Sequence, residues 1–337
     1  MFRNASVEKD AESSLSSRAY SLALAPQIIH TKAELLSQLV SSKAFKQIEF
    51  LAVGSFYVYQ PPSETEPKPT LSRIPSTRED VFANTAIAAK SKRYLMKFLK
   101  FVVEYDGEAQ EEVWKPTAEE PLVDFLASEF KLDAALQSYI LALTLSLDGK
   151  VSVAEGLAAI HRHMTSMGMF GPGFAAVYAK WGGLSEVAQV GCRAAAVGGT
   201  IYMLGTGVKD TRGGESEVEV TLANDMVVKS KMLVQSHQDD PTAPSLSRLI
   251  AVVASPLTPL FEAVIEGAPT PAVVVVAFPP GTISTENREA SEYPIYAMVH
   301  SSDSGECPVG QSKLIPVLIT SLLARMINII QILIYIV

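Results

Sequence analysis

Residues Leu71–Phe101, LSRIPSTREDVFANTAIAAKSKRYLMKFLKF, are the stretch from which the fold of this chain can be worked out. Pro75-Ser76-Thr77 is a helix-start signal, and Glu79 and Asp80 follow in the first turn, where acidic groups suit the positive end of the helix dipole. Apolar residues then recur at largely helical spacing, interspersed with cations. The apolar set is Phe82, Ile87, Tyr94, Leu95, Phe98, Leu99 and Phe101, and the cations are Lys90, Lys92, Arg93, Lys97 and Lys100. The pattern alone predicts a helix with a buried apolar face and a solvated basic face.

The composition around this stretch is that of a globular protein. A chain of 337 residues with 48% apolar and 19% charged residues can build two domains with a substantial core. Its net charge of −8 provides no basic field for a nucleic acid, so that class of partner is excluded. Cys192 and Cys307 have no partner motif, which argues against a disulfide framework or a zinc site and favours a reducing cytosol.

The pattern along the chain predicts an α/β domain interrupted by a helical insertion. Residues 18–72 begin the α/β domain, 73–168 form the insertion, 169–311 complete the α/β domain, and 312–337 form an apolar tail. Helices are expected over 32–43, 121–130, 132–146, 152–166 and 184–197. Strands are expected over 20–24, 47–53, 55–59, 200–204, 217–222, 226–235, 249–254, 272–278 and 295–300. The valine run at 272–278 indicates a strand buried on both faces, and the acidic stretch 104–120 indicates a solvated loop.

Three patterns resemble sites of chemistry, and each has a simpler interpretation. Residues 171–176, GPGFAA, match the form G-x-G-x-x-A of a dinucleotide loop, but no strand precedes them, so a turn is expected. His161 and His163 would point about 200° apart on a helix, which favours surface histidines over a metal pair. The cluster of Ser, His and Asp at 236–240 is a polar loop, because a catalytic triad is assembled in space and not by adjacency.

Pro75–Phe101 resembles the first helix of the smaller domain in the Rab escort protein and Rab GDP-dissociation-inhibitor family. Three other segments support the likeness: Tyr20–Tyr59 is similar to the family's strand–helix–strand region, Gly171–Leu204 to its return into the larger domain, and Ser301–Gln311, SSDSGECPVGQ, to a C-terminal motif. The likeness covers residues 20–311 and is closer to the escort branch, which is component A of Rab geranylgeranyltransferase.

The resemblance implies an α/β domain of the FAD/NAD(P)-binding-like, glutathione-reductase-like class that holds no flavin, with an inserted all-helical domain that carries lipid. It implies a non-catalytic cytoplasmic protein without cofactor or metal, delivered transiently to membranes. Such a protein binds GDP-bound Rab GTPases, presents them to Rab geranylgeranyltransferase and shields their geranylgeranyl groups. Two alternatives stay open: a GDP-dissociation inhibitor that recycles prenylated Rabs, and, from another class, a flavin- or NAD-dependent oxidoreductase.

The resemblance also implies roles for individual residues. In escort proteins a phenylalanine and an arginine eleven positions later dock onto the transferase, and Phe82 and Arg93 have that spacing here. Since eleven residues make about three helical turns, both would lie on one face of one helix. The alternatives are that Phe82 is an aromatic residue of the core and that Arg93 is a solvated charge. The Rab-binding platform would include Arg73, Ser76, Arg78 and Asp80, by resemblance only. The lipid slot is expected among the Leu-, Ala- and Met-rich helices 132–146 and 152–169.

Both ends of the chain depart from the family. The first strand and glycine-rich loop of the α/β domain are expected to be missing. Leu314–Val337 is a run of 24 residues with one charge, Arg325, which as a helix would extend about 36 Å. Two interpretations are open for it: a gene-model artefact produced by translating an intron, and a transmembrane helix.

Overall fold

The structure is a computed structural model that describes residues 5–9, 16–64, 66–85, 87–214, 216–234, 246–263, 265–284, 290–319 and 323–337. It divides into two compact units. The first unit consists of Met1–Ser13 and Gln189–Pro244, and the second of Ser14–Ala188 and Ser245–Val337. Each unit is described by itself.

The second unit is built on a mixed sheet, of which nine strands lie in the described residues. In spatial order the strands are β1 (Ile29–His30), β4 (Ala176–Ala179), β2 (Phe50–Gln60), β10 (Val273–Phe278), β11 (Ile295–Ser301), β12 (Ser312–Leu318) and β8 (Ser247–Arg248). β3 (Thr70–Arg73) pairs with β2, and β9 (Ala251–Val253) pairs with β12. The pair β2–β10 is parallel and the other pairs are antiparallel.

The valine-rich strand β10 is buried along its whole length. Val275 and Ala277 pack into one hydrophobic cluster, while Val274, Val276 and Phe278 pack into another. Because successive side chains of a strand point to opposite faces, these two clusters lie on the two faces of the sheet. The prediction that this strand is covered on both sides is confirmed.

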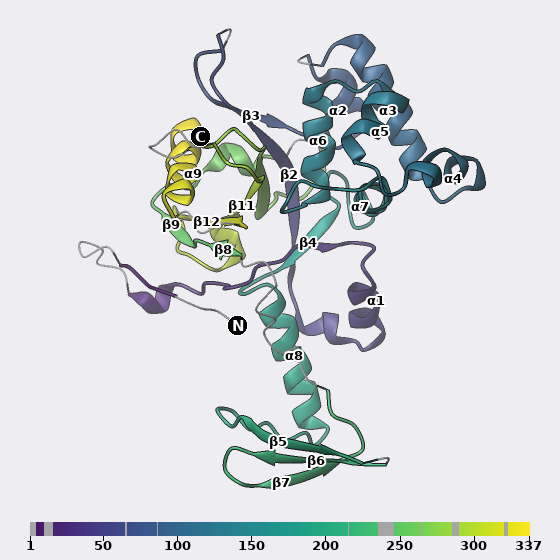
Figure 1. Ribbon diagram of the computed structural model, residues 1–337. Coiled ribbons are helices and arrows are strands. Elements are labelled where there is room, and N and C mark those ends of the chain that lie inside the picture. The colour runs from purple at the N-terminus through teal and green to yellow at the C-terminus, as the bar shows by residue number, and fades with distance from the viewer. Residues whose placement is uncertain are drawn as a thin grey trace. The chain divides into compact units, whose positions relative to one another are not determined.

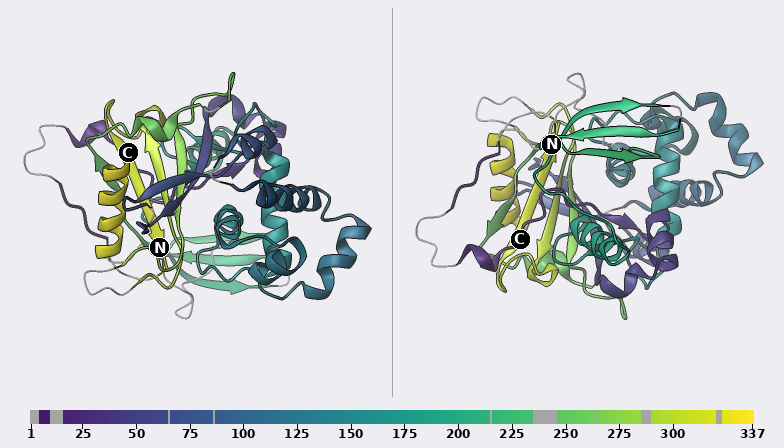
Figure 2. Two further views of the ribbon diagram at one scale, coloured as in Figure 1. Left: turned by 90° about the horizontal axis from the view of Figure 1, so that it is seen from above. Right: turned by 90° about the horizontal axis from the view of Figure 1, so that it is seen from below.

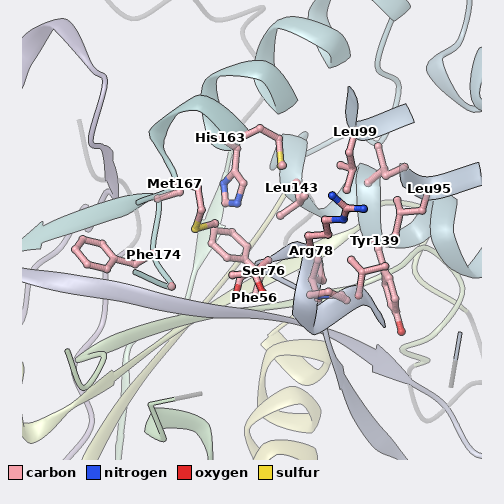
Figure 3. A pocket seen from close by; sticks show the side chains of 18 of the residues that line it. Phe56, Ser76, Arg78, Leu95, Leu99, Tyr139, Leu143, His163, Met167 and Phe174 are labelled. Carbon is pink, nitrogen blue, oxygen red and sulfur yellow. The ribbon is translucent and has the colours of Figure 1, made fainter. Parts of the chain in front are cut away.

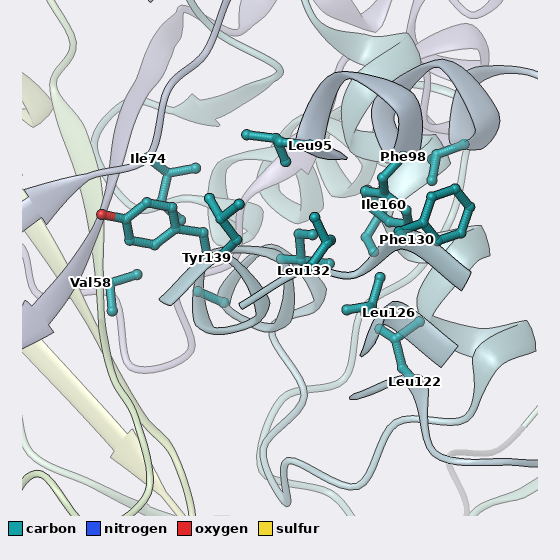
Figure 4. Packing of buried hydrophobic residues seen from close by; sticks show 14 of the residues in the cluster. Val58, Ile74, Leu95, Phe98, Leu122, Leu126, Phe130, Leu132, Tyr139 and Ile160 are labelled. Atoms are coloured by element: carbon teal, nitrogen blue, oxygen red, sulfur yellow. The ribbon is translucent and has the colours of Figure 1, made fainter. Parts of the chain in front are cut away.

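In the described residues, six α-helices are inserted between β3 and β4, and their bundle packs against one face of the sheet (Figures 1 and 2). They are α2 (Arg78–Ala83), α3 (Ala89–Val103), α4 (Glu108–Trp114), α5 (Leu122–Phe130), α6 (Ala134–Thr144) and α7 (Val153–Ser166). Their shared core includes Phe98, Leu126 and Ile160, which are fully buried (Figure 4). The start of α7 is fixed by a capping box between Ser152 and Glu155. This helical insertion confirms the predicted fold class.

The opposite face is covered by α9 (Leu323–Ile336), through Met326, Ile329 and Leu333 (Figures 1 and 2). Leu314–Val337 do not form the single helix that the transmembrane interpretation requires, because Leu314–Leu318 belong to the buried strand β12. Arg325, the one charge of this run, is 7% exposed, and its Nη2 donates to the carbonyl of Ala290 at 3.1 Å. In the described part of the chain, no helix is long and apolar enough to cross a membrane.

Four further expectations differ from the structure. In place of the two strands expected over 47–53 and 55–59, Phe50–Gln60 form one strand, β2, that continues through Gly54. The absence of a side chain at Gly54 leaves room for Pro271, which a Cβ at this position would meet. The acidic stretch contains α4, where the Trp114 indole donates to the Tyr105 carbonyl at 2.9 Å. Residues 20–24 and 200–204 form no strand.

α1 (Glu34–Ser41) packs beside β1 and β4 in the second unit. The helix α8 (Leu184–Val197) has the bounds expected from the sequence and runs from the second unit into the first. The first unit then adds the antiparallel strands β5 (Val208–Gly213), β6 (Val218–Leu222) and β7 (Val227–Ser230). Asp225 takes a left-handed φ of 63° at the hairpin turn between β6 and β7. The boundaries proposed from the sequence for the domains stay a prediction.

Candidate functional site

An apolar cavity of about 360 Å³ lies where the inserted helices meet strand β2 (Figure 3). Its wall comes from β2, the segment between β3 and α2, the helices α3, α6 and α7, and residues 173–175. Residues that give it its character are Leu95, Leu99, Tyr139, Leu143, Met164 and Met167. The volume is in the range of a small-molecule site, and methionine side chains adapt to flexible apolar ligands.

Charged side chains lie at the edge of this cavity. Arg78 and Lys100 are both exposed and both contribute to the lining, together with Glu104. The Arg78 guanidinium lies 5.6 Å from the centre of the Phe82 ring, and its side chain extends along the cavity in Figure 3. The cavity therefore combines an apolar interior with a polar edge.

Of the residues expected to form a partner platform, three are bonded to one another. Arg73 donates to both carboxylate oxygens of Asp80, at 2.8 and 2.5 Å, and the backbone N–H of Ser76 donates to Asp80 Oδ2 at 2.9 Å. The N-cap Thr77 accepts from the N–H of Asp80 at 3.1 Å. Asp80 thus connects β3 to the start of α2 and shapes the cavity wall, while Arg78 stays exposed.

Replacing Asp80 with asparagine is expected to lower the free energy of unfolding by about 1–2 kcal/mol, because a charge-assisted bidentate pair is lost. The pair is mostly shielded, with side chains 24% and 14% exposed. Urea unfolding would measure the loss. The exposed pair Lys115–Glu111 provides the control, since Glu111→Gln should change stability by less than about 0.5 kcal/mol. Equal effects of the two substitutions would contradict the structural role of Asp80.

Phe82 and Arg93 lie on two helices, because α2 ends at Ala83 and α3 begins at Ala89. The expectation that they share one face of one helix is wrong, because α2 ends with an extended backbone conformation at Asn84. The two helices stay close, as Lys92 Nζ donates to the Phe82 carbonyl at 2.7 Å. Phe82 is 52% exposed and Arg93 is exposed, which removes the core alternative for Phe82.

His163 is buried and lines the cavity, so the expectation of two surface histidines is wrong. It continues the buried face of α7 three residues after Ile160, and this spacing could have revealed it in the sequence. Burial, with His30 and Arg162 nearby, lowers the pKa of His163 to about 3. His161 is half-buried on another side of α7, with its Nδ1 3.0 Å from the Val102 carbonyl.

The glycine motif at 171–176 does not form a dinucleotide site. Residues 171–176 follow helix α7 as a turn and lead into strand β4, which is the reverse of the strand–loop–helix order of a dinucleotide site. The cluster at 236–240 lies outside the described residues. Among the residues that are described, no three His, Cys, Asp or Glu side chains gather as a metal site would require.

Fold and cavity together define an α/β protein whose inserted helices enclose an apolar chamber of the size of one hydrophobic ligand. The GDP dissociation inhibitor family matches residues 1–258, and the chain belongs to this family.

Similar proteins include the Rab proteins geranylgeranyltransferase component A of Saccharomyces cerevisiae, 31% identical over 303 residues, which are 88% of this chain and 47% of that protein. The protein of the same name from Candida albicans is 28% identical over 310 residues, covering 88% of this chain and 46% of the relative. The chain thus spans about half the length of these relatives. A solved Rab GDI from Plasmodium falciparum shares the fold, with a TM-score of 0.67, 18% identity, and coverage of 94% of this chain and 71% of that one.

Proposed function

We propose that this chain is a Rab escort protein: it binds GDP-bound Rab GTPases, presents them to Rab geranylgeranyltransferase and shields the attached geranylgeranyl groups. The observation that carries the proposal is the apolar cavity beneath α3, together with the exposed Phe82 beside the same helix. The names of the two yeast relatives, both component A of the transferase, support this choice within the family. The role is that of a non-catalytic accessory subunit in the cytoplasm, with transient delivery to membranes.

The cavity accounts for the lipid part of this function. A prenyl chain gains about 0.8 kcal/mol for each methylene that leaves water, so an enclosed apolar wall can compete with a membrane for it. Three helices of the wall, α3, α6 and α7, each supply side chains from a face that also builds the core. Small displacements of these helices would adjust the chamber to the length of the chain.

The α2–α3 surface accounts for docking to the transferase. Phe82 provides an exposed aromatic anchor, and Arg93 lies one residue beyond Lys92, which is bonded to the Phe82 carbonyl. Aromatic and arginine side chains are the residue types that most often dominate binding energy at interfaces. Lys90, Arg93, Lys97 and Lys100 are all exposed on α3, which contains no acidic residue, so an acidic surface on the partner is favoured.

Phe82→Ala is expected to weaken binding to purified Rab geranylgeranyltransferase at least about 30-fold, because loss of a hot-spot aromatic costs about 2 kcal/mol or more. Isothermal titration calorimetry of the complete chain with the transferase would measure the change. Stability should stay unchanged, since the side chain is 52% exposed. Val113→Ala on α4, where the valine is 43% exposed, is the matched control and should bind normally. Wild-type binding by Phe82→Ala would refute the docking site.

A recycling GDP-dissociation inhibitor is the second candidate, because the family match and the fold of the Plasmodium falciparum Rab GDI are compatible with it. The two candidates differ in one measurable respect: the recycling protein needs no transferase contact. A folded chain that binds prenylated Rab and not the transferase would establish the second candidate. The oxidoreductase alternative is not supported, because residues 171–176 do not have the geometry of a dinucleotide loop.

A further inference from the structure

The apolar cavity contains one buried polar side chain that the proposed function does not use. His163 is 4% exposed, lines the cavity, and has no hydrogen-bond partner for its Nδ1 in the described residues. Figure 3 shows its ring pointing from α7 toward Phe56 and Met167. Buried polar groups in folded proteins are nearly always bonded, so an unpartnered imidazole nitrogen at a cavity calls for a partner from outside the chain.

The groups around His163 cannot provide that partner. The ring of Phe56 meets the imidazole edge-on with centres 5.1 Å apart, and the ring of His30 does so at 5.7 Å. The neighbouring lining residues Met164, Met167 and Phe174 are apolar. A thioether or a phenyl ring is at best a weak acceptor, and the His30 imidazole meets the ring edge-on without a hydrogen bond to Nδ1, so Nδ1 of His163 is left without a partner.

The protonation state of the His163 ring limits which chemical groups of a ligand it can bind. A neutral imidazole has one nitrogen that donates and one that accepts, so it suits a group that can do either, as a hydroxyl can. The titratable groups that face it are His30 and Arg162, and both disfavour its protonation, as does burial. A neutral hydroxyl is therefore a better match than a carboxylate, which would bring a charge into an apolar chamber.

The rest of the cavity provides the apolar part of the match. In Figure 3 His163 and Met167 lie at one end of the chamber, while Leu95 and Tyr139 lie at the other. We propose that His163 is a hydrogen-bonding subsite and that the cavity takes free long-chain alcohols of the isoprenoid type, with the hydroxyl on the imidazole and the chain along α3 and α6. This inference rests on one part of the proposed function, namely that this cavity binds an apolar lipid chain.

Three probes that differ only at one end would test the proposal: geranylgeraniol, its methyl ether, and the hydrocarbon in which hydrogen replaces the hydroxyl. Their affinities for the complete chain would be measured by competition with a fluorescent prenyl probe. The wild-type chain is expected to bind the alcohol about 10-fold more tightly than the hydrocarbon. His163→Phe should abolish this preference and leave hydrocarbon binding unchanged or stronger. Val113→Ala on α4, which does not line the cavity, is the control and should keep the preference.

The possible results separate this inference from the proposed function. Equal binding of the alcohol and the hydrocarbon by the wild-type chain, or a preference that persists in His163→Phe, would overturn the hydroxyl subsite and leave the lipid cavity intact. Binding of none of the probes would overturn both. If His163→Phe does not fold, nuclear magnetic resonance of the imidazole nitrogens of wild-type His163 provides the test. These resonances should shift when the alcohol binds and not when the hydrocarbon binds. The absence of that difference would refute the proposal.

A fourth probe, geranylgeranoic acid, tests the charge of the ligand. The hydroxyl subsite predicts that the ionised acid binds more weakly than the alcohol at neutral pH. Tighter binding of the acid, increasing as the pH falls, would show that His163 binds a carboxylate as an imidazolium, and the proposal for an alcohol would be wrong.

Discussion

Lys313→Met is expected to destabilise the second unit by about 3–5 kcal/mol, because it leaves a buried carboxylate without its cation. Lys313 on β12 and Glu306 form an ion pair in which both side chains are 0% exposed. His300 Nδ1 lies 2.5 Å from the second oxygen of Glu306, and the N–H of Ala23 donates to the first at 3.1 Å. The network thus joins two strands to the N-terminal segment. Differential scanning calorimetry would measure the loss of stability in Lys313→Met.

The matched control removes both charges. In the double variant Glu306→Gln with Lys313→Met, no uncompensated ion remains, so most of the lost stability should return. A Lys313→Met protein that is as stable as the wild type would show that Glu306 is neutral in the folded chain. A double variant no better than the single one would show that the geometry of the network, and not its charge, holds the strands together.

The same network predicts an acid dependence of stability. Burial opposes the ionisation of Glu306, but His300 and Lys313 outweigh it and lower the pKa to about 2 from its ordinary 4.5. A carboxyl with a depressed folded pKa stabilises the fold fully above the unfolded pKa, and this contribution is lost as the pH falls from about 4.5 toward about 2. Glu306→Gln should therefore unfold with a shallower pH dependence over that interval than the wild type does.

Much of the fold can be predicted from local pattern. The valine run of β10 and the bounds of α8 follow from composition and periodicity, because buried strands and amphipathic helices repeat their apolar residues at fixed spacing. The family likeness around Pro75–Phe101 locates the helical insertion. The split of that stretch into α2 and α3 is not visible from spacing, since Phe82 and Arg93 fit one continuous helix as well as two.

Features that depend on distant partners escape prediction. Gly54 interrupts the pattern of β2 in the sequence, yet in the fold it is the position at which Pro271 approaches. The C-terminal residues resemble a membrane span because β12 is buried in the sheet and α9 packs one apolar face against it. The spacing of His163 after Ile160 indicates a buried position on α7, but the sequence does not show that this position borders a cavity, because that depends on the packing of α7 against Phe56.

Leu143→Trp is expected to reduce affinity for a geranylgeranyl chain about 100-fold by filling the cavity. Leu143 on α6 lines the chamber and points into it in Figure 3, so the larger indole would exclude several methylenes of the ligand. At about 0.8 kcal/mol for each methylene, exclusion of about four of them costs about 3 kcal/mol of binding free energy, which corresponds to that factor. Competition with a fluorescent prenyl probe would measure it.

Two comparisons make the cavity prediction specific to lipid binding. Binding of the transferase to the α2–α3 surface should stay near its wild-type level in Leu143→Trp, because Phe82 is not among the residues that line the cavity. Leu222→Trp, on β6 in the other unit, adds the same bulk at a residue that does not line the chamber and should leave lipid affinity unchanged.

If Leu143→Trp folds and still binds the prenyl chain with wild-type affinity, the lipid lies elsewhere, and the chamber beneath α3 owes its shape to packing alone. A loss of lipid affinity with intact transferase binding would instead show that one helix, α3, has two separable roles, since its outer face meets the partner while its inner face encloses the lipid.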